Sequence, residues 1–152
     1  MSLHIIAIGK KHEDWVGTAI ERYQKRLKQP FSVEWVLLPH SSYEEDKARQ
    51  EESERILTKL SGYDFVILLD ERGKMIDSPT LGAMINERVS HSAKIAFVIG
   101  GAYGVTEQLR QAVQFIWSLS PLVFPHQLVR LMLIEQIYRS QQIEAGSSYH
   151  HQ

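Results

Sequence analysis

Compact apolar runs alternate with longer stretches of helical periodicity along the chain. Apolar runs of strand length occupy residues 3–9, 31–38, 65–70, 95–100 and 115–118. Helix-like spacing of apolar positions occupies residues 14–27, 44–60, 79–89, 106–113 and 125–145. This alternation predicts an α/β fold. Two of the apolar runs are nearly continuous, which is typical of strands that are buried on both faces of a parallel sheet.

Capping residues and charge mark the predicted helices. Ser78 and Thr106 are expected to cap two of them, because their hydroxyls can accept a hydrogen bond from the first turn. Gly146 is expected to end the last helix. The charged run over residues 43–55 is interpreted mainly as the solvated face of the second helix, with partner binding as the alternative.

The last predicted helix is apolar in nearly every direction around its axis. Such a helix must be buried on more than one side. In a chain this short, the second side is expected to be another copy of the chain, which predicts a homodimer. Arg130 lies among these apolar residues and needs a carboxylate or phosphate partner. Glu135 and Arg139 are spaced for an intrahelical ion pair, and His126 is interpreted as a structural histidine, with a base as the alternative.

Composition narrows the class of protein. The 152 residues fit one domain, 1–152. The absence of cysteine excludes disulfides, thiolate metal sites and cysteine nucleophiles. With 17 basic and 18 acidic residues, the chain offers no global attraction for nucleic acid, so RNA would have to meet a local basic patch, which is densest over residues 10–28. No apolar run could span a bilayer and the N-terminus lacks signal-peptide features, so we expect a cytoplasmic protein that does not contact membranes.

Two loops rich in small residues are candidate ligand contacts. The glycines of residues 100–104 follow a strand and precede a helix, where they permit close approach of a ligand; a tight turn is the alternative. Their spacing and position differ from those of nucleotide-binding glycine loops. The apolar residues 122–124 predict burial, and we expect residues 119–124 to face a flat, partly apolar ligand such as a purine, with Ser120 adding a hydroxyl. A buried loop that supports the core is the alternative.

Five motifs occur together in this chain. They are Gly100-Gly101-x-x-Gly104, Leu119-Ser120, Phe124-Pro125-His126-Gln127-Leu128-Val129-Arg130, Glu135-Gln136-Ile137-Tyr138-Arg139 and Tyr149-His150. In combination they resemble the RlmH family of ribosomal RNA large subunit methyltransferases, in the SPOUT superfamily. Gly9-Lys10, Trp15 and a turn at residues 69–74 also fall where that family has them. The similarity covers the whole chain, and the block at residues 125–130 is its most specific part.

The resemblance implies a homodimeric SPOUT-type α/β domain, with a mostly parallel sheet and a C-terminal trefoil knot over about residues 95–152. It implies S-adenosylmethionine as methyl donor, no metal, and N3 of a pseudouridine in the helix 69 loop of 23S rRNA, on the assembled ribosome, as acceptor. By positional match, the cofactor-binding residues are Leu69, Gly100, Gly101, Gly104, Leu119, Ser120, Pro121, Leu122, Val123 and Phe124.

The acceptor nitrogen must lose a proton, so a base or a cation near it would assist methyl transfer. We assign Arg139, Tyr149 and His150 to this neighbourhood, with His150 as the candidate base and Arg139 as an electrostatic or phosphate contact. A frayed terminus is the alternative for the tail. The chain departs from the family at its end: His151 stands where a basic residue is common, and Ser148 where proline is common. A transfer RNA methyltransferase of SPOUT type and a non-catalytic ribosome-binding factor stay open as other functions.

Overall fold

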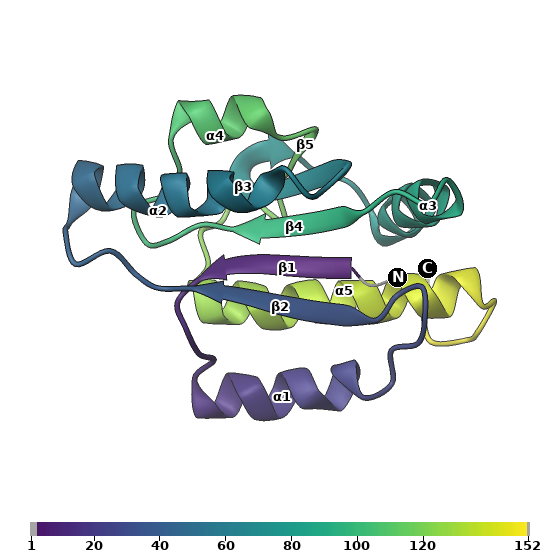
Figure 1. The fold of residues 1–152 in the computed structure, drawn as a ribbon. Helices are drawn as coiled ribbons and strands as arrows, with labels where there is room; N and C mark the ends of the chain where they lie inside the picture. The colour runs from purple at the N-terminus through teal and green to yellow at the C-terminus, as the bar shows by residue number, and fades with distance from the viewer. Residues whose placement is uncertain (1–2, 152) are drawn as a thin grey trace.

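The structure is a computed structural model and describes residues 3–151. Five strands form one sheet in the order β2-β1-β4-β3-β5. They are β1 (Leu3–Ile8), β2 (Val33–Leu38), β3 (Phe65–Lys74), β4 (Ile95–Ile99) and β5 (Phe115–Trp117). The helices are α1 (Asp14–Gln24), α2 (Glu45–Leu60), α3 (Ser78–Ser90), α4 (Glu107–Ala112) and α5 (His126–Glu144). The strands pair in parallel throughout the sheet, so the predicted fold class is confirmed (Figure 1).

Helices cover both faces of the sheet. Alternate strand residues point to opposite faces, so Ile5 packs with α3 and α5 whereas Ile6 packs with α2 and α4. Helix α1 lies on α5, where Val16 and Ile20 meet Ile134. Figure 1 shows α2 and α4 on one side of the strands and α1 and α5 on the other. The sheet, α1 and α3 therefore bury α5 from several directions within one chain, so its apolar pattern does not by itself require a second copy.

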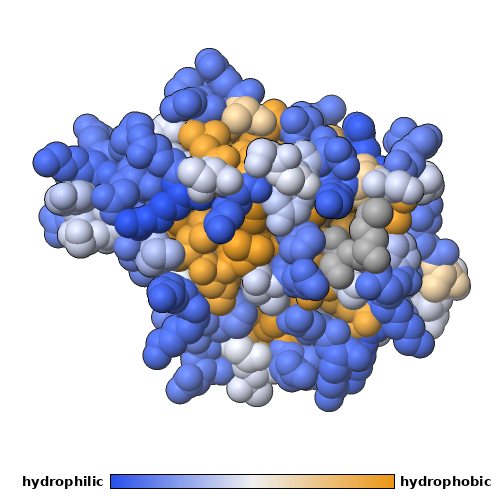
Figure 2. Space-filling model, in the orientation of Figure 1, coloured by the Kyte–Doolittle hydropathy of each residue, from blue (hydrophilic) through white to orange (hydrophobic). Residues whose placement is uncertain are grey.

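Hydrophobic surface is concentrated near the middle of the face that Figure 2 shows, where the sheet lies in the same view of Figure 1. Hydrophilic residues cover most of the remaining surface of that face. This distribution agrees with two apolar cores, one on each side of the sheet. Among residues 3–151, no helix has both the length and the apolar character needed to cross a membrane.

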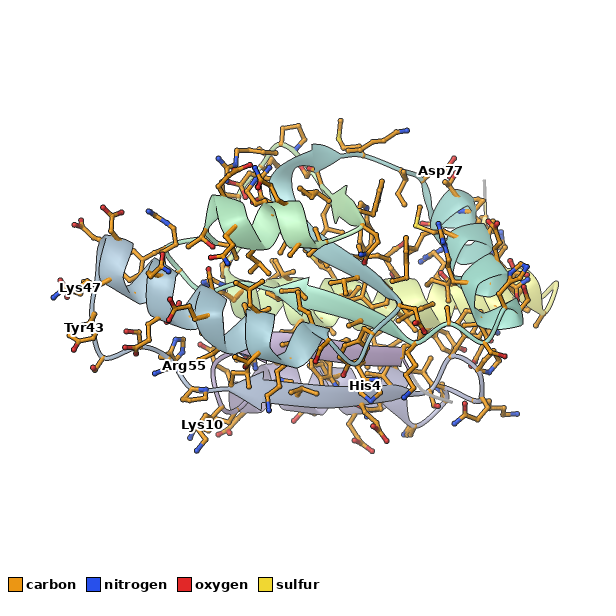
Figure 3. All side chains as sticks on the ribbon, turned by 45° about the horizontal axis from the view of Figure 1, so that its top comes forward. His4, Lys10, Tyr43, Lys47, Arg55 and Asp77 are labelled. Atoms are coloured by element: carbon orange, nitrogen blue, oxygen red, sulfur yellow. The ribbon has the colours of Figure 1, made fainter. Side chains whose placement is uncertain are left out.

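Helix α2 carries most of the charged run at residues 43–55. Lys47 lies over the ring of Tyr43 with 5.1 Å between the Nζ atom and the ring centroid, and Figure 3 shows both side chains at the outer end of the helix. The predicted solvated face is confirmed for these residues. Glu52 and Ser53 are buried, however, because they lie on the side of α2 that packs inward.

Two helix caps were predicted, and one is confirmed. Thr106 caps α4, because its Oγ accepts the backbone N–H of Leu109 over 3.3 Å. The prediction of Ser78 as a cap is wrong: α3 begins one residue earlier than expected, and the carboxylate of Asp77 accepts the Thr80 N–H over 2.9 Å. Asp77 is labelled at the start of this helix in Figure 3.

Strand β3 is longer than its apolar residues predict. Residues 69–74, which resembled a turn, continue the strand and pair again with β5 after a register shift. Gly73 permits this pairing, because a Cβ atom there would lie 2.5 Å from the carbonyl oxygen of Ile116. This pairing holds the polar end of β3 on the side of the sheet where the carboxyl ends of the other strands lie. At the far end of the chain, Gly146 has φ +70° and ends α5 as expected.

Candidate methyltransferase site

A pocket opens where the carboxyl ends of the parallel strands meet, and we call it the edge pocket. Its walls come from the end of β3, the loop after β4, the loop after β5 and the first turn of α5. This is the edge at which parallel α/β sheets generally bind ligands. The predicted cofactor residues that line it are Leu69, Gly100, Gly101, Gly104, Leu119, Ser120, Leu122, Val123 and Phe124. Pro121 is exposed and is not among the lining residues.

The glycine loop after β4 is tightly packed, because side chains would not fit at its first two glycines. A Cβ atom at Gly100 would lie 2.7 Å from Cγ1 of Val105, and one at Gly101 would overlap the carboxylate of Glu52. Gly104 has φ +78°, a conformation that residues with a side chain rarely adopt. The first two glycines therefore let the loop pack closely against Val105 and Glu52, and the third turns the chain toward α4.

The loop after β5 forms the opposite wall of the edge pocket. Ser118 Oγ donates to the carbonyl of Ser120 over 3.0 Å, and Ser120 Oγ accepts the N–H of Leu122 over 3.0 Å. The prediction that these apolar residues are buried is wrong for two of them: Leu122 is 68% exposed and Val123 is 78% exposed. Their side chains stand at the pocket rim, where a ligand or a partner can cover them.

Arg130 is fully buried and fastens α5 to the end of β1. Its Nη2 donates to the carbonyls of Ile8 over 2.9 Å and Gly9 over 3.0 Å. Its Nη1 donates to the carbonyl of Lys11 over 3.2 Å and lies 3.1 Å from Nδ1 of His12. The prediction of a carboxylate or phosphate partner is therefore wrong, because backbone carbonyls accept from both Nη atoms of this cation instead. Its Nε atom is buried without a partner among the described residues. Burial lowers the pKa of His12, and the Arg130 charge lowers it further.

The two polar residues before Arg130 also hold α5 in place. His126 lines the edge pocket and hydrogen-bonds the backbone of Gly100. Burial lowers the pKa of His126 despite the opposing effect of that hydrogen bond, so the ring is neutral near pH 7. Gln127 Oε1 accepts the N–H of Glu13 over 3.0 Å. The interpretation of His126 as a structural, hydrogen-bonding histidine is confirmed.

Asp70 carries the main charge at the β3 side of the pocket. Its carboxylate lies between the guanidinium groups of Arg72 and Arg110. Burial acts to raise the pKa of Asp70, but hydrogen bonds from Arg72 and the charges of both arginines outweigh it, so the pKa is lowered. Asp70 is thus an ionised carboxylate with two counter-ions.

The tail residues Tyr149 and His150 pack against α5. Glu135 Oε2 accepts from Arg139 Nη2 over 2.8 Å, which confirms the predicted ion pair. The same oxygen accepts from the phenol of Tyr149 over 3.0 Å. The Arg139 guanidinium lies 4.8 Å from the Tyr149 ring centroid, and its Nη1 lies 3.0 Å from Nδ1 of His150. The structure therefore brings together all three predicted catalytic residues.

This cluster fixes the hydrogen-bonding roles of its members. A guanidinium can only donate, so His150 Nδ1 accepts and the hydrogen of the neutral ring resides on Nε2. Burial and the hydrogen bond to Glu135 raise the pKa of Tyr149 to about 12, so its phenol stays protonated at neutral pH. Both tail residues are therefore hydrogen-bond donors in this arrangement.

A second cavity, which we call the tail pocket, lies beside the first. It is lined by His150, His151 and Glu135 on one side and by the start of α3 on the other. Trp117 and Leu119 line both pockets. The two pockets therefore adjoin each other at these side chains.

The chain matches a family model described as "Predicted SPOUT methyltransferase" over residues 1–150. The chain belongs to the SPOUT methyltransferase family. The resemblance inferred from its motifs is confirmed, and it extends through both pockets of this SPOUT domain.

Several curated relatives of this SPOUT chain share a name. "Ribosomal RNA large subunit methyltransferase H" of Pelobacter propionicus is 38% identical over 153 residues, covering 99% of this chain and 100% of the relative. The protein of the same name from Desulfitobacterium hafniense is 35% identical over 158 residues, covering 99% of each chain. Among solved structures, a probable methylase family protein from Haemophilus influenzae superposes with a TM-score of 0.57 at 13% identity, covering 99% of this chain and 70% of that one. That likeness supports the fold.

Glu135 has a larger role than its spacing revealed. The i, i+4 spacing to Arg139 predicted an ion pair, but its contact with Tyr149 comes from residues 14 positions apart. No pattern in the sequence indicates this second contact. Trp117, which lines both pockets, ends a strand and gave no functional signal at all.

Proposed function

We propose that this protein is an S-adenosylmethionine-dependent methyltransferase that modifies N3 of a pseudouridine in the helix 69 loop of 23S rRNA. The adjacency of the edge pocket and the tail pocket carries the proposal, because methyl transfer needs donor and acceptor held in line at short range. The names of the curated relatives support ribosomal RNA as the acceptor class.

The edge pocket fits an adenosyl cofactor. Gly100 and Gly101 line it without side chains of their own, and Leu69 supplies an apolar wall. The Ser120 hydroxyl accepts from Leu122 and keeps its own hydrogen available for a ligand acceptor. When bound, S-adenosylmethionine supplies an activated methyl group on a sulfonium.

His150, which lines the tail pocket, and its neighbours Arg139 and Tyr149 would prepare the acceptor. The pyrimidine imide nitrogen loses its proton, and negative charge then develops on the neighbouring carbonyl oxygens. The Arg139 cation and the His150 Nε2–H can stabilise this charge, while the Tyr149 phenol keeps the tail docked on Glu135. His150 can act as the expected base only if Arg139 no longer hydrogen-bonds the Nδ1 atom of His150. With Nδ1 engaged, the proton passes to water.

A homodimer and a knotted C-terminal segment are part of this proposal. The exposed apolar side chains of Leu122 and Val123 at the pocket rim support an interface there. The crossing from β5, at one edge of the sheet, to α5, where Arg130 contacts the end of β1, supports threading of residues 95–152. We place the reaction in the cytoplasm, on the assembled ribosome.

Transfer of labelled methyl groups tests the proposal. The protein is incubated with S-adenosylmethionine and either intact ribosomes that lack the modification, free 23S rRNA or transfer RNA. Label in ribosomes alone is expected. Label in transfer RNA alone would favour a tRNA methyltransferase. No label with any acceptor, together with no cofactor binding, would favour a non-catalytic ribosome-binding factor.

A further inference from the structure

Glu52 is a buried carboxylate beneath the glycine loop of the edge pocket. It lies in α2 and is 4% exposed. Its Oε2 accepts the backbone N–H of Ser41 over 2.9 Å and lies 3.9 Å from Nδ1 of His40. Its Oε1 is buried without a hydrogen-bond partner among the described residues and abuts Gly101, where a Cβ atom would overlap it. An unpartnered buried oxygen is costly, so its retention beside a ligand pocket calls for an explanation.

Helix α2 holds this carboxylate rigidly against the loop. Arg49 Nε donates to the carbonyl of Tyr103 over 2.8 Å, and Ser53 Oγ accepts the N–H of Thr106 over 3.0 Å. Arg49, Glu52 and Ser53 are spaced i, i+3 and i+4, so they share one face of the helix. These two hydrogen bonds, from residues on either side of Glu52 in α2, hold Glu52 in place against the glycine loop.

Among the described residues, no cationic side chain hydrogen-bonds the carboxylate of Glu52. Burial lowers the pKa of His126, which favours its neutral form. The His40 side chain is 65% exposed and lies beyond hydrogen-bond distance of the carboxylate. Arg130 donates to backbone carbonyls around Gly9, whose dipoles oppose its charge. Asp70, by contrast, is paired with arginines.

We propose that Glu52 is a specificity-determining residue whose buried charge favours a cationic occupant of the edge pocket over its neutral counterpart. The inference rests on the proposed function. In that reaction the methyl carbon bonds to the acceptor nitrogen, and the sulfur keeps the electron pair of the broken bond and becomes a neutral thioether. The acceptor proton passes to water. The ligand thus loses one positive charge, so Glu52 holds S-adenosylmethionine more tightly than S-adenosylhomocysteine and assists product exchange.

Calorimetric titration with these two ligands tests the inference, because they differ by the methyl group and its charge. The wild-type protein is compared with Glu52→Gln and with a control, Glu54→Gln, an exposed carboxylate in the same helix. In Glu52→Gln, the dissociation constant for S-adenosylmethionine is expected to rise about three- to tenfold, as loss of a nearby charge at intermediate dielectric predicts. The dissociation constant for S-adenosylhomocysteine is expected to change less than about twofold. The control variant Glu54→Gln is expected to change neither dissociation constant.

Equal weakening of both ligands would overturn the inference, because it would show only a structural role for Glu52. Unchanged binding of both would overturn it as well. If Glu52→Gln unfolds, Glu52→Met, which removes the charge at similar volume, replaces it. The wild-type protein gives an independent measure: sinefungin, with an amine cation in place of the sulfonium, must bind more tightly than S-adenosylhomocysteine. If wild-type protein binds neither nucleoside, the proposed function fails, whereas binding without charge discrimination defeats only the role of Glu52.

Discussion

The phenol of Tyr149 donates a hydrogen bond to the carboxylate of Glu135 over 3.0 Å and thereby ties the end of the chain to the middle of α5. Glu135 also binds Arg139, whose guanidinium covers the Tyr149 ring and contacts His150. One carboxylate thus organises the three residues assigned to the acceptor. His150 thereby lies in the wall of the tail pocket.

The titration of Tyr149 reports this contact. Its folded pKa of about 12 lies above the ordinary value of 10.0, because burial and Glu135 disfavour the phenolate. The stability that this protonated phenol contributes is therefore complete below pH 10 and is lost as the pH rises toward 12. Glu135→Gln removes the carboxylate charge and is expected to lower this pKa. Tyrosinate absorbance, with Tyr149→Phe subtracted to isolate the residue, measures it; an unchanged titration in Glu135→Gln would contradict the contact.

Two substitutions separate the donor and base roles of His150. Glutamine retains an N–H near the position of Nε2, whereas alanine retains nothing. If His150 donates a hydrogen bond, His150→Gln keeps kcat within about tenfold of wild type and His150→Ala loses about a hundredfold at saturating substrates. If His150 is the base, kcat is expected to fall to a similar extent in both variants. A wild-type rate in His150→Ala would remove the residue from the mechanism altogether.

Arg130 is expected to act on stability. Replacing it with alanine leaves the carbonyls of Ile8 and Gly9 without their donor and creates a cavity beneath β1. We expect a loss of about 3 kcal/mol or more in the free energy of unfolding, measured with urea. Arg72→Ala, at an exposed arginine on the same edge of the sheet, is the control and should cost less than about 1 kcal/mol. Similar losses in both variants would show that the carbonyl contacts contribute little.

The basic region at the end of α1 is a candidate ribosome contact. Lys25 and Arg26 are exposed there and are absent from the linings of both pockets, although the nearby Tyr23 lines the tail pocket. Reversing both charges is expected to weaken ribosome binding by about tenfold or more at moderate salt, because phosphate contacts dominate such affinities. S-adenosylmethionine binding should be unchanged. Lys59→Glu, at an exposed site in the last turn of α2, is the control, and equal effects of both changes would assign the loss to net charge alone.

The order of strands and helices could be predicted because it depends on local periodicity. The structure adds what depends on contacts between distant residues. The polar end of β3 continues the strand because Gly73 can pack against Ile116, and no apolar pattern reveals this. Arg130 could be recognised as a cation in need of partners, but which acceptors it meets depends on how α5 packs against β1.

The candidate site was predictable only where its residues form a local sequence pattern. Glycine loops and the motif at residues 125–130 leave a clear pattern, so the edge pocket could be located from its residues. Glu52 left no such signal, because it lies in a charged run whose other members are mostly solvated. Burial of Leu122 and Val123 was predicted from their hydrophobicity, which does not show whether a partner or the core covers a side chain.

The identity of the methylated nucleoside tests the central claim most directly. Ribosomes that lack the modification are treated with the protein and S-adenosylmethionine, and the helix 69 fragment of their 23S rRNA is isolated and digested to nucleosides. The nucleosides are separated by liquid chromatography and identified by mass spectrometry against standards of the isomeric methylated nucleosides. The account predicts 3-methylpseudouridine from the helix 69 loop, and none when free 23S rRNA or transfer RNA replaces the ribosome. A methyl group on another nucleoside, or on transfer RNA, would contradict it.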